Sequence, residues 1–131
     1  MAIRIVRLGS PRGAGEGLRL GTVRRPPRGV PKEEFAKRDF YDQWLPQLAP
    51  SAELMKFAQQ AQASGDDKAW AQFVKKFRAE LGEGETPRLL DLLAALSHGA
   101  PMALGCYCED ETRCHRSVLR ALLAERGAEL V

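Results

Sequence analysis

The stretch that decides the fold of this chain runs from Met102 to Leu123 and reads MALGCYCEDETRCHRSVLRALL. Its first seven residues, 102–108, are mostly apolar and predict a short strand that is buried on both faces. The valine and leucines that follow recur at helical spacing and predict an amphipathic helix from about Cys114 to Arg126. All three cysteines of the protein fall within nine residues of this strand, loop and helix, so function is expected here.

Two more strands are expected in the first part of the chain. Residues 3–8 form a short β-branched run, and residues 18–25 alternate imperfectly between apolar and polar side chains. Between them, four glycines and a proline in residues 9–17 predict an irregular loop. The segment 32–48 has a mixed pattern that predicts one broken helix or two short ones, and residues 129–131 could begin a last strand.

Three helices are expected in the middle of the chain, each preceded by a residue that caps helices well. They begin near Ser51, near Asp66 or Asp67, and at Thr86-Pro87. Long helical connections between strands favour parallel pairing. We therefore expect one α/β domain over residues 1–131, with a small, mostly parallel sheet of three or four strands flanked by helices.

The bulk composition is that of a globular protein. The chain has 131 residues, of which 44% are hydrophobic and 28% charged. No apolar run approaches the roughly 20 residues that span a bilayer, and no secretory signal is visible, so we expect a cytoplasmic protein without a membrane partner. An odd number of cysteines in such a protein favours reduced thiols, metal ligands or redox groups over a disulfide framework.

Positive charge is concentrated in the first third of the chain. Residues 1–38 contain ten Lys/Arg and three acids, a net charge of +7, so the total of +3 leaves −4 for the remainder. Such a segment favours an anionic partner, either a small ligand such as a nucleotide or a phosphorylated metabolite, or nucleic acid. Equally, the charges could simply be solvated or paired within the protein.

Three loops should meet at the carboxyl ends of the predicted parallel strands, where ligands collect in open sheets. They are the glycine-rich segment 9–17, the arginine-rich segment 24–29 and the cysteine-bearing segment 106–116. We expect a polar cleft there, whose candidate ligand-binding residues are Arg24, Arg25, Arg28, Arg116 and Cys106. Cys114 and His115 are the candidate catalytic residues.

The chemistry of the cysteine segment has three interpretations. In the first, Cys114 or Cys108 is a nucleophile, His115 is its acid or base, and Arg116 or Arg113 holds an anion.

In the second, a metal-binding or redox-sensing module uses Cys106, Cys108, Cys114 and His115, which are ligands suited to zinc or iron. The spacing differs from the usual C-x2-C pairs, and adjacent residues seldom reach one tetrahedral ion. In the third interpretation the cysteines are small buried hydrophobic residues. The residues alone specify no cofactor.

The chain resembles the DUF488 family of uncharacterised proteins, particularly its YeaO-like branch, over nearly its whole length. In the front half the likeness rests on residues 18–21, 23–29, 44–45 and 48–54, and in the back half on Trp70, Phe73, Phe77, Glu80 and Leu81. The Cys-His-Arg sequence eight residues after a strand cysteine looks like the commonest signature of this family, onto which Cys106, Cys114, His115 and Arg116 map.

Arg24 and Arg25 look like the arginine pair of this family after its second strand, although Thr22 stands where an acid is often found. The resemblance implies a small α/β fold and supports a shared pocket. It implies no particular reaction. From the residues and the resemblance together, the expected function is binding of a small anionic ligand, with or without thiol or acid/base catalysis. The alternatives are the metal-binding or redox-sensing module and a basic nucleic-acid-binding accessory protein.

Overall fold

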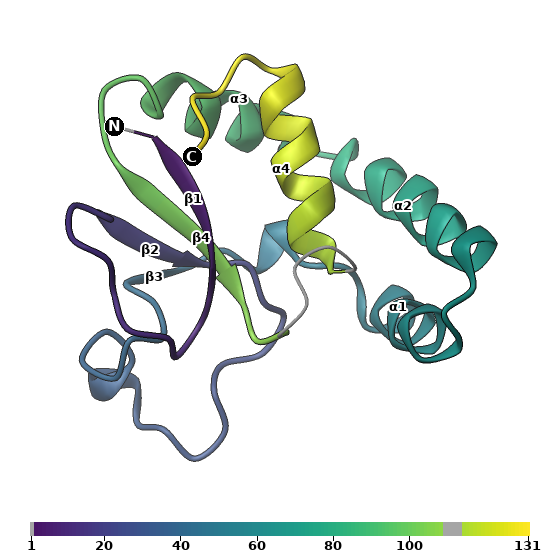
Figure 1. Cartoon of the computed structure of the whole chain (residues 1–131), viewed down its shortest axis with the longest axis horizontal. Helices are drawn as coiled ribbons and strands as arrows, with labels where there is room; N and C mark the ends of the chain where they lie inside the picture. The colour runs from purple at the N-terminus through teal and green to yellow at the C-terminus, as the bar shows by residue number, and fades with distance from the viewer. Residues whose placement is uncertain (1, 109–113) are drawn as a thin grey trace.

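The computed structural model of the protein describes residues 2–108 and 114–131. Four strands and four α-helices make up most of the described chain (Figure 1). In order they are β1 (Ile3–Arg7), β2 (Leu18–Gly21), β3 (Gln43–Trp44), α1 (Ala52–Ser64), α2 (Asp67–Leu81), α3 (Thr86–Leu96), β4 (Met102–Cys106) and α4 (His115–Glu125). This architecture confirms the predicted α/β fold.

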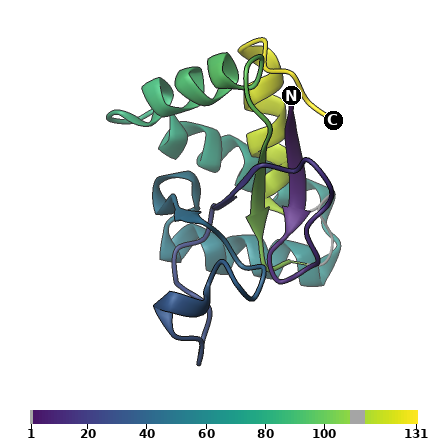
Figure 2. The same ribbon diagram turned by 90° about the vertical axis from the view of Figure 1, so that its left-hand side faces the viewer.

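The sheet is parallel at each pairing, in the strand order β1-β4-β2-β3. β4 lies between β1 and β2 and is buried over its full length, as its apolar sequence predicts. Ile3 also forms a parallel bridge to Leu130, so the predicted last strand is reduced to one bridge beside β1. The ends of the chain consequently lie near each other (Figure 1 and Figure 2).

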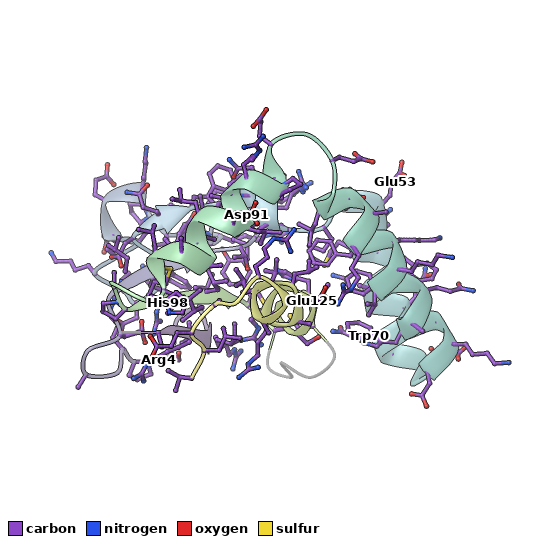
Figure 3. All side chains as sticks on the ribbon, turned by 90° about the horizontal axis from the view of Figure 1, so that it is seen from above. Arg4, Glu53, Trp70, Asp91, His98 and Glu125 are labelled. Carbon is purple, nitrogen blue, oxygen red and sulfur yellow. The ribbon has the colours of Figure 1, made fainter. Side chains whose placement is uncertain are left out.

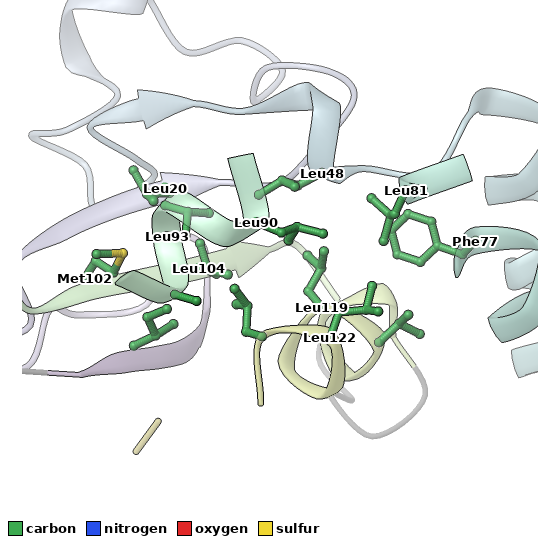
Figure 4. Packing of buried hydrophobic residues seen from close by; sticks show 14 of the residues in the cluster. Leu20, Leu48, Phe77, Leu81, Leu90, Leu93, Met102, Leu104, Leu119 and Leu122 are labelled. Atoms are coloured by element: carbon green, nitrogen blue, oxygen red, sulfur yellow. The ribbon is translucent and has the colours of Figure 1, made fainter. Parts of the chain in front are cut away.

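The two faces of the sheet are covered differently. Ile3, Leu20, Met102 and Leu104 lie on one face and share a hydrophobic core with residues of all four α-helices (Figure 4). Irregular segments cover the opposite face of the sheet. There the ring of Tyr41 packs over Gly21, and Leu8, which follows β1, packs over Gly105 beside Val6 of β1. Helices therefore shield one side of the sheet and loops shield the other, whereas the sequence predicted a sheet flanked by helices.

The predicted helix starts are accurate to a residue. Ser51 caps α1 by accepting a hydrogen bond from the Leu54 N–H, and Asp66 caps α2 through the Lys68 N–H. Along α2, Phe73, Phe77 and Leu81 form the buried face that their spacing predicts. α3 begins at Thr86, with Glu85 in the capping position that we expected for Thr86.

In the segment 32–48, the two short helices of the prediction exist as single turns, but a strand between them was not predicted. The segment forms two 3-10 turns, Lys32–Glu34 and Pro46–Leu48, which flank the short strand β3. β3 exists because the main chain of Leu20 and Gly21 pairs with it, a contact that helical periodicity could not predict. The second strand is also shorter than expected and ends at Gly21, before the arginine-rich segment.

Exposed ion pairs connect α4 to its helical neighbours. Arg126 bonds Asp91 of α3 at 2.9 Å, and Glu125 bonds Arg78 of α2 at 2.7 Å. Figure 3 shows Asp91 and Glu125 on these helices, seen from above. Among the described residues, no helix is both long and apolar enough to span a bilayer.

Candidate functional site

The Cys-His-Arg sequence and the cysteine at the end of β4 come together in the tertiary structure. Cys106 is the last residue of β4, Cys114 precedes α4, and His115 and Arg116 begin that helix. Each of the four side chains is at most 4% exposed. The intervening residues 109–113, which include Arg113 and the three acids, lie outside the described residues.

The two buried thiols are in direct contact. The Sγ atoms of Cys106 and Cys114 are 2.9 Å apart, and both cysteines are free. Hydrogen bonds from Cys106 and then Cys108 hold the pKa of the Cys114 thiol far below its usual value, and His115 adds to the effect.

The pKa of Cys106 is raised by its hydrogen bonds with Cys108 and Cys114 and by burial. The hydrogen bond with Cys106 acts to lower the pKa of Cys108. The hydrogen bond with Cys114 and burial act in the opposite direction and are together larger, so the pKa of Cys108 is raised. Negative charge therefore concentrates on Cys114, while Cys106 and Cys108 remain protonated donors.

The imidazole of His115 is held between the sheet and this thiol. Its Nε2 lies 2.6 Å from the main-chain carbonyl oxygen of Thr22, and its Nδ1 lies 3.7 Å from the Cys114 Sγ. A carbonyl oxygen can only accept, so Nε2 carries a hydrogen, and in the neutral ring Nδ1 is free to accept the Cys114 proton. The ring of Phe77 packs edge-on against the imidazole at 5.9 Å.

Arg116 supplies a positive charge next to the thiols. It is 1% exposed, and its terminal nitrogens donate to the carbonyl oxygens of Val6 at 2.5 Å and Cys108 at 2.6 Å. Burial acts to lower the pKa of Arg116, but attraction to the thiol cluster outweighs burial and raises it. These contacts favour a positioning role, in which Arg116 ties β1 to the Cys108 backbone and offsets the buried thiolate charge.

A cavity of about 110 Å³ borders Cys114. Its wall comprises Cys108, Cys114, His115, Phe73 of α2 and four residues of α1, namely Met55, Ala58, Gln59 and Gln62. Cys106 is absent from this wall. The cavity therefore exposes one member of the Cys106–Cys114 pair and shields the other behind it.

The three arginines after β2 do not line this cavity. Arg24 donates to the carbonyl oxygens of Pro50 at 3.0 Å and Ala49 at 3.2 Å, just before α1. The side chains of Arg25 and Arg28 are exposed and form no ion pair with any residue that the structure describes. The hydroxyl of Tyr107 donates to the Arg25 carbonyl at 3.0 Å, so the arginine segment lies beside the cysteine segment.

The glycine-rich segment 9–17 is occupied by internal ion pairs. Glu16 bonds the buried guanidinium of Arg19 at 2.9 Å, and Arg12 bonds Asp42 at 2.8 Å. Arg19 also donates to the carbonyl oxygens of Ser10 and Asp39, which fastens this segment over the loop-covered face of the sheet. Part of the basic charge of the first third is thus neutralised within the fold.

Sequence reasoning missed the residues that complete the site. Thr22 was noted only because it replaces an acid, yet its carbonyl oxygen orients His115. Met55, Gln59 and Gln62 of α1 line the cavity, but nothing in their spacing separates them from a solvated helix face. Their role follows from the position of α1 and the start of α4 around one cavity, which local sequence does not encode.

The expected metal ligands are only partly assembled. Ligand atoms of Cys106, Cys114 and His115 all lie within 4.8 Å of one another, so the adjacent Cys114 and His115 do approach each other, contrary to expectation. Cys108 is not part of this group. Two thiolates on tetrahedral zinc, with Zn–S bonds of about 2.3 Å, would be about 3.8 Å apart. The observed 2.9 Å is shorter than this separation, so the two sulfur atoms are too close to be two ligands of one zinc ion.

Comparison with known proteins identifies the family. Residues 3–127 match the model of DUF488-N3a, described as the active DUF488-N3 subclade. Searches of curated proteins and of solved structures gave no match. This match spans nearly the whole chain. Membership of the YeaO-like branch stays a prediction. The chain therefore belongs to the DUF488 family, in its DUF488-N3a subclade.

Proposed function

We propose that this protein is a thiol-dependent enzyme that acts on a small, anionic, electrophilic ligand. Cys114 is its nucleophile and His115 its acid and base. The observation that carries the proposal is the arrangement of Cys114 Sγ, His115 Nδ1 and the Thr22 carbonyl oxygen beside a cavity. A nucleophile, a base and a group that orients the base are the three parts of a nucleophilic site.

The residues support a two-step group transfer. Cys114 is a thiolate whose proton is held on His115 Nδ1, and this thiolate attacks the electrophilic atom, forming a bond from sulfur. His115 then returns the proton to the leaving group as its bond breaks. Water, deprotonated by His115, releases the transferred group and restores the thiol. The first N–H groups of α4 have no intrahelical acceptor and would stabilise negative charge on the reacting oxygen.

The anionic character of the ligand rests on charge. Arg25 and Arg28 have exposed guanidiniums without an ion pair among the described residues, and the hydroxyl of Tyr107, which stands between Cys106 and Cys108 in the chain, donates to the Arg25 carbonyl oxygen. Exposed arginines near a site raise the local concentration of an anion and bind carboxylate or phosphate in a planar fork. The description of the subclade as active agrees with an intact nucleophile and base.

A burst assay with p-nitrophenyl acetate tests the nucleophile. The wild-type protein should release about one equivalent of nitrophenolate rapidly and carry an acetyl group on Cys114, located by peptide mass analysis. Cys114→Ser should lose the burst, while Cys108→Ser, which alters the other cysteine in the cavity wall, should keep it. Acetylation of Cys108 in place of Cys114, or an undiminished burst in Cys114→Ser, would refute the assignment.

Thermal unfolding with inorganic phosphate tests the anion site. Phosphate should raise the Tm of the wild type, and the double variant Arg25→Gln/Arg28→Gln should lose that rise. The matched control Lys75→Gln/Arg88→Gln removes two exposed charges elsewhere and should retain the rise. If both double variants lose the phosphate-induced rise in Tm equally, phosphate responds only to the net charge of the protein, and the proposed anion site is refuted.

A further inference from the structure

In the group transfer described above, Cys106 only donates a hydrogen bond to the Cys114 nucleophile, and its own thiol does not react. Their sulfur atoms are 2.9 Å apart, so a shift of about 0.9 Å would bring them to the length of a disulfide bond. Leu8, Val23 and Tyr41 pack around the pair, so a bond formed there would be enclosed by apolar side chains. Two free thiols at this separation are poised for oxidation.

The two thiols differ in their access to the cavity. Cys114 lines it, next to His115, whereas Cys106 does not. A small oxidant that enters the cavity therefore meets Cys114 first. Cys106 lies behind it, within reach of an oxidised Cys114 but away from the oxidant.

We propose that Cys114 and Cys106 form a reversible disulfide pair that reduces small hydroperoxides, with Cys114 attacking the peroxide and Cys106 resolving the product. The inference shares the activated Cys114 with the proposed function but needs a second thiol, which the group transfer does not. The residues that serve it are His115, which exchanges protons, and Arg116, whose charge lies beside the pair.

The chemistry balances with a hydroperoxide as the oxidant. The Cys114 thiolate attacks the terminal oxygen, forming an S–O bond while the O–O bond breaks. The departing oxygen takes a proton from His115 and leaves as water or an alcohol. The Cys106 sulfur then displaces hydroxide from the Cys114 sulfenic acid, and its thiol proton converts that hydroxide to water. Two thiols have supplied two electrons, and an external dithiol restores them by exchange.

The size of the cavity restricts the oxidant. Its volume, taken as the space open to the centre of a water-sized molecule, is about 110 Å³. Hydrogen peroxide fits this space. Cumene hydroperoxide, which carries a phenyl ring and three more carbons, is much larger. Cys114 should therefore react faster with hydrogen peroxide than with cumene hydroperoxide.

Peptide mass analysis tests the proposal on the wild-type protein. One equivalent of hydrogen peroxide, followed by N-ethylmaleimide, should leave only Cys108 alkylated and yield a Cys106–Cys114 disulfide that dithiothreitol reverses. Cys108→Ser should form the same Cys106–Cys114 disulfide and leave no cysteine for N-ethylmaleimide. Cys106→Ser should accumulate a sulfenic acid on Cys114 that dimedone traps. A disulfide that includes Cys108, or oxidation no faster than that of free cysteine, would overturn the proposal.

The two proposals fail separately. Cys106→Ser retains Cys114 and should keep the burst with p-nitrophenyl acetate while losing the disulfide. A burst without disulfide formation would refute only the peroxide reaction. Disulfide formation without a burst would refute only the group transfer. Because mapping of the wild type needs no variant, the peroxide test holds even if Cys106→Ser fails to fold.

Discussion

The Nε2 of His115 lies 2.6 Å from the main-chain carbonyl oxygen of Thr22, a residue 93 positions earlier in the chain. The contact exists because β2 and β4 are neighbours in the sheet. Just past the end of β2, the Thr22 N–H and hydroxyl each donate to the Gly105 carbonyl oxygen at 2.9 Å. The sheet thus fixes the orientation of the imidazole, which leaves Nδ1 toward Cys114. This relationship links the fold to the proposed chemistry.

Alkylation of Cys114 by iodoacetamide should be largely independent of pH between about 6 and 9. The reason is that its pKa is held far below the usual value, first by the hydrogen bond from Cys106. Cys106→Ala removes that bond and should move the reaction midpoint to higher pH. His115→Gln removes a smaller contribution to the low pKa of Cys114 and should move the reaction midpoint by less than Cys106→Ala does.

The matched control is Cys106→Ser, whose hydroxyl still donates and should preserve more of the low-pH reactivity than Cys106→Ala. Rates are measured by mass spectrometry of the Cys114 peptide. A wild-type rate that rises tenfold per pH unit up to pH 8.5 would contradict an activated thiolate.

Arg116→Met should lower the free energy of unfolding by about 3 kcal/mol or more. The substitution leaves the carbonyl oxygens of Val6 and Cys108 without their buried donor, and each orphaned acceptor costs about 1–3 kcal/mol. Urea unfolding followed by circular dichroism measures the change. The control Arg120→Met alters an exposed arginine of the same helix and should change stability by no more than about 0.5 kcal/mol.

Glu16→Gln should lower stability at pH 7 by about 3 kcal/mol, because it leaves the buried Arg19 guanidinium without its counter-charge. The hydrogen bond from Arg19 lowers the pKa of Glu16 in the fold from its ordinary 4.5. A lowered pKa stabilises the fold above pH 4.5, and that stability is lost as the pH falls through the folded-state pKa.

The difference in unfolding free energy between wild type and Glu16→Gln should therefore shrink as the pH falls below about 4.5. Urea titrations at pH 7, 5, 4 and 3 measure it. Glu33→Gln changes an exposed acid of the same basic segment and should give a small difference at every pH. A difference for Glu16→Gln that stays constant with pH would show that its charge is not the cause.

Freshly purified protein should contain far less than one equivalent of zinc or iron. The sulfur atoms at 2.9 Å are closer than two zinc ligands, and Cys108 is outside the group of three. Elemental analysis of protein prepared without chelators measures the content. Near one equivalent, lost together in Cys106→Ser and Cys114→Ser, would favour the metal-binding alternative over a free nucleophile.

Local sequence was sufficient for the elements whose cause is local. Ser51 and Asp66 start helices because their side chains bond main-chain N–H groups two or three residues away. The apolar run at residues 102–106 also has a local cause. Its side chains are apolar at nearly every position, which favours a strand buried on both faces whichever residues surround it. β3 was missed because its two residues are strand only through pairing with β2.

By itself, the sequence determined the α/β class, the parallel sheet, the family and the placing of Cys106, Cys114, His115 and Arg116 around one strand–helix junction. Only the tertiary structure decided that the Thr22 carbonyl orients His115 and that residues of α1 form a wall of the cavity. It also decided that Arg116 donates to main-chain carbonyl oxygens and that Cys106 lies behind Cys114. Periodicity specifies which face of an element is buried. Which residues from distant elements meet there depends on strand order and helix packing, and these arise from contacts across the whole chain.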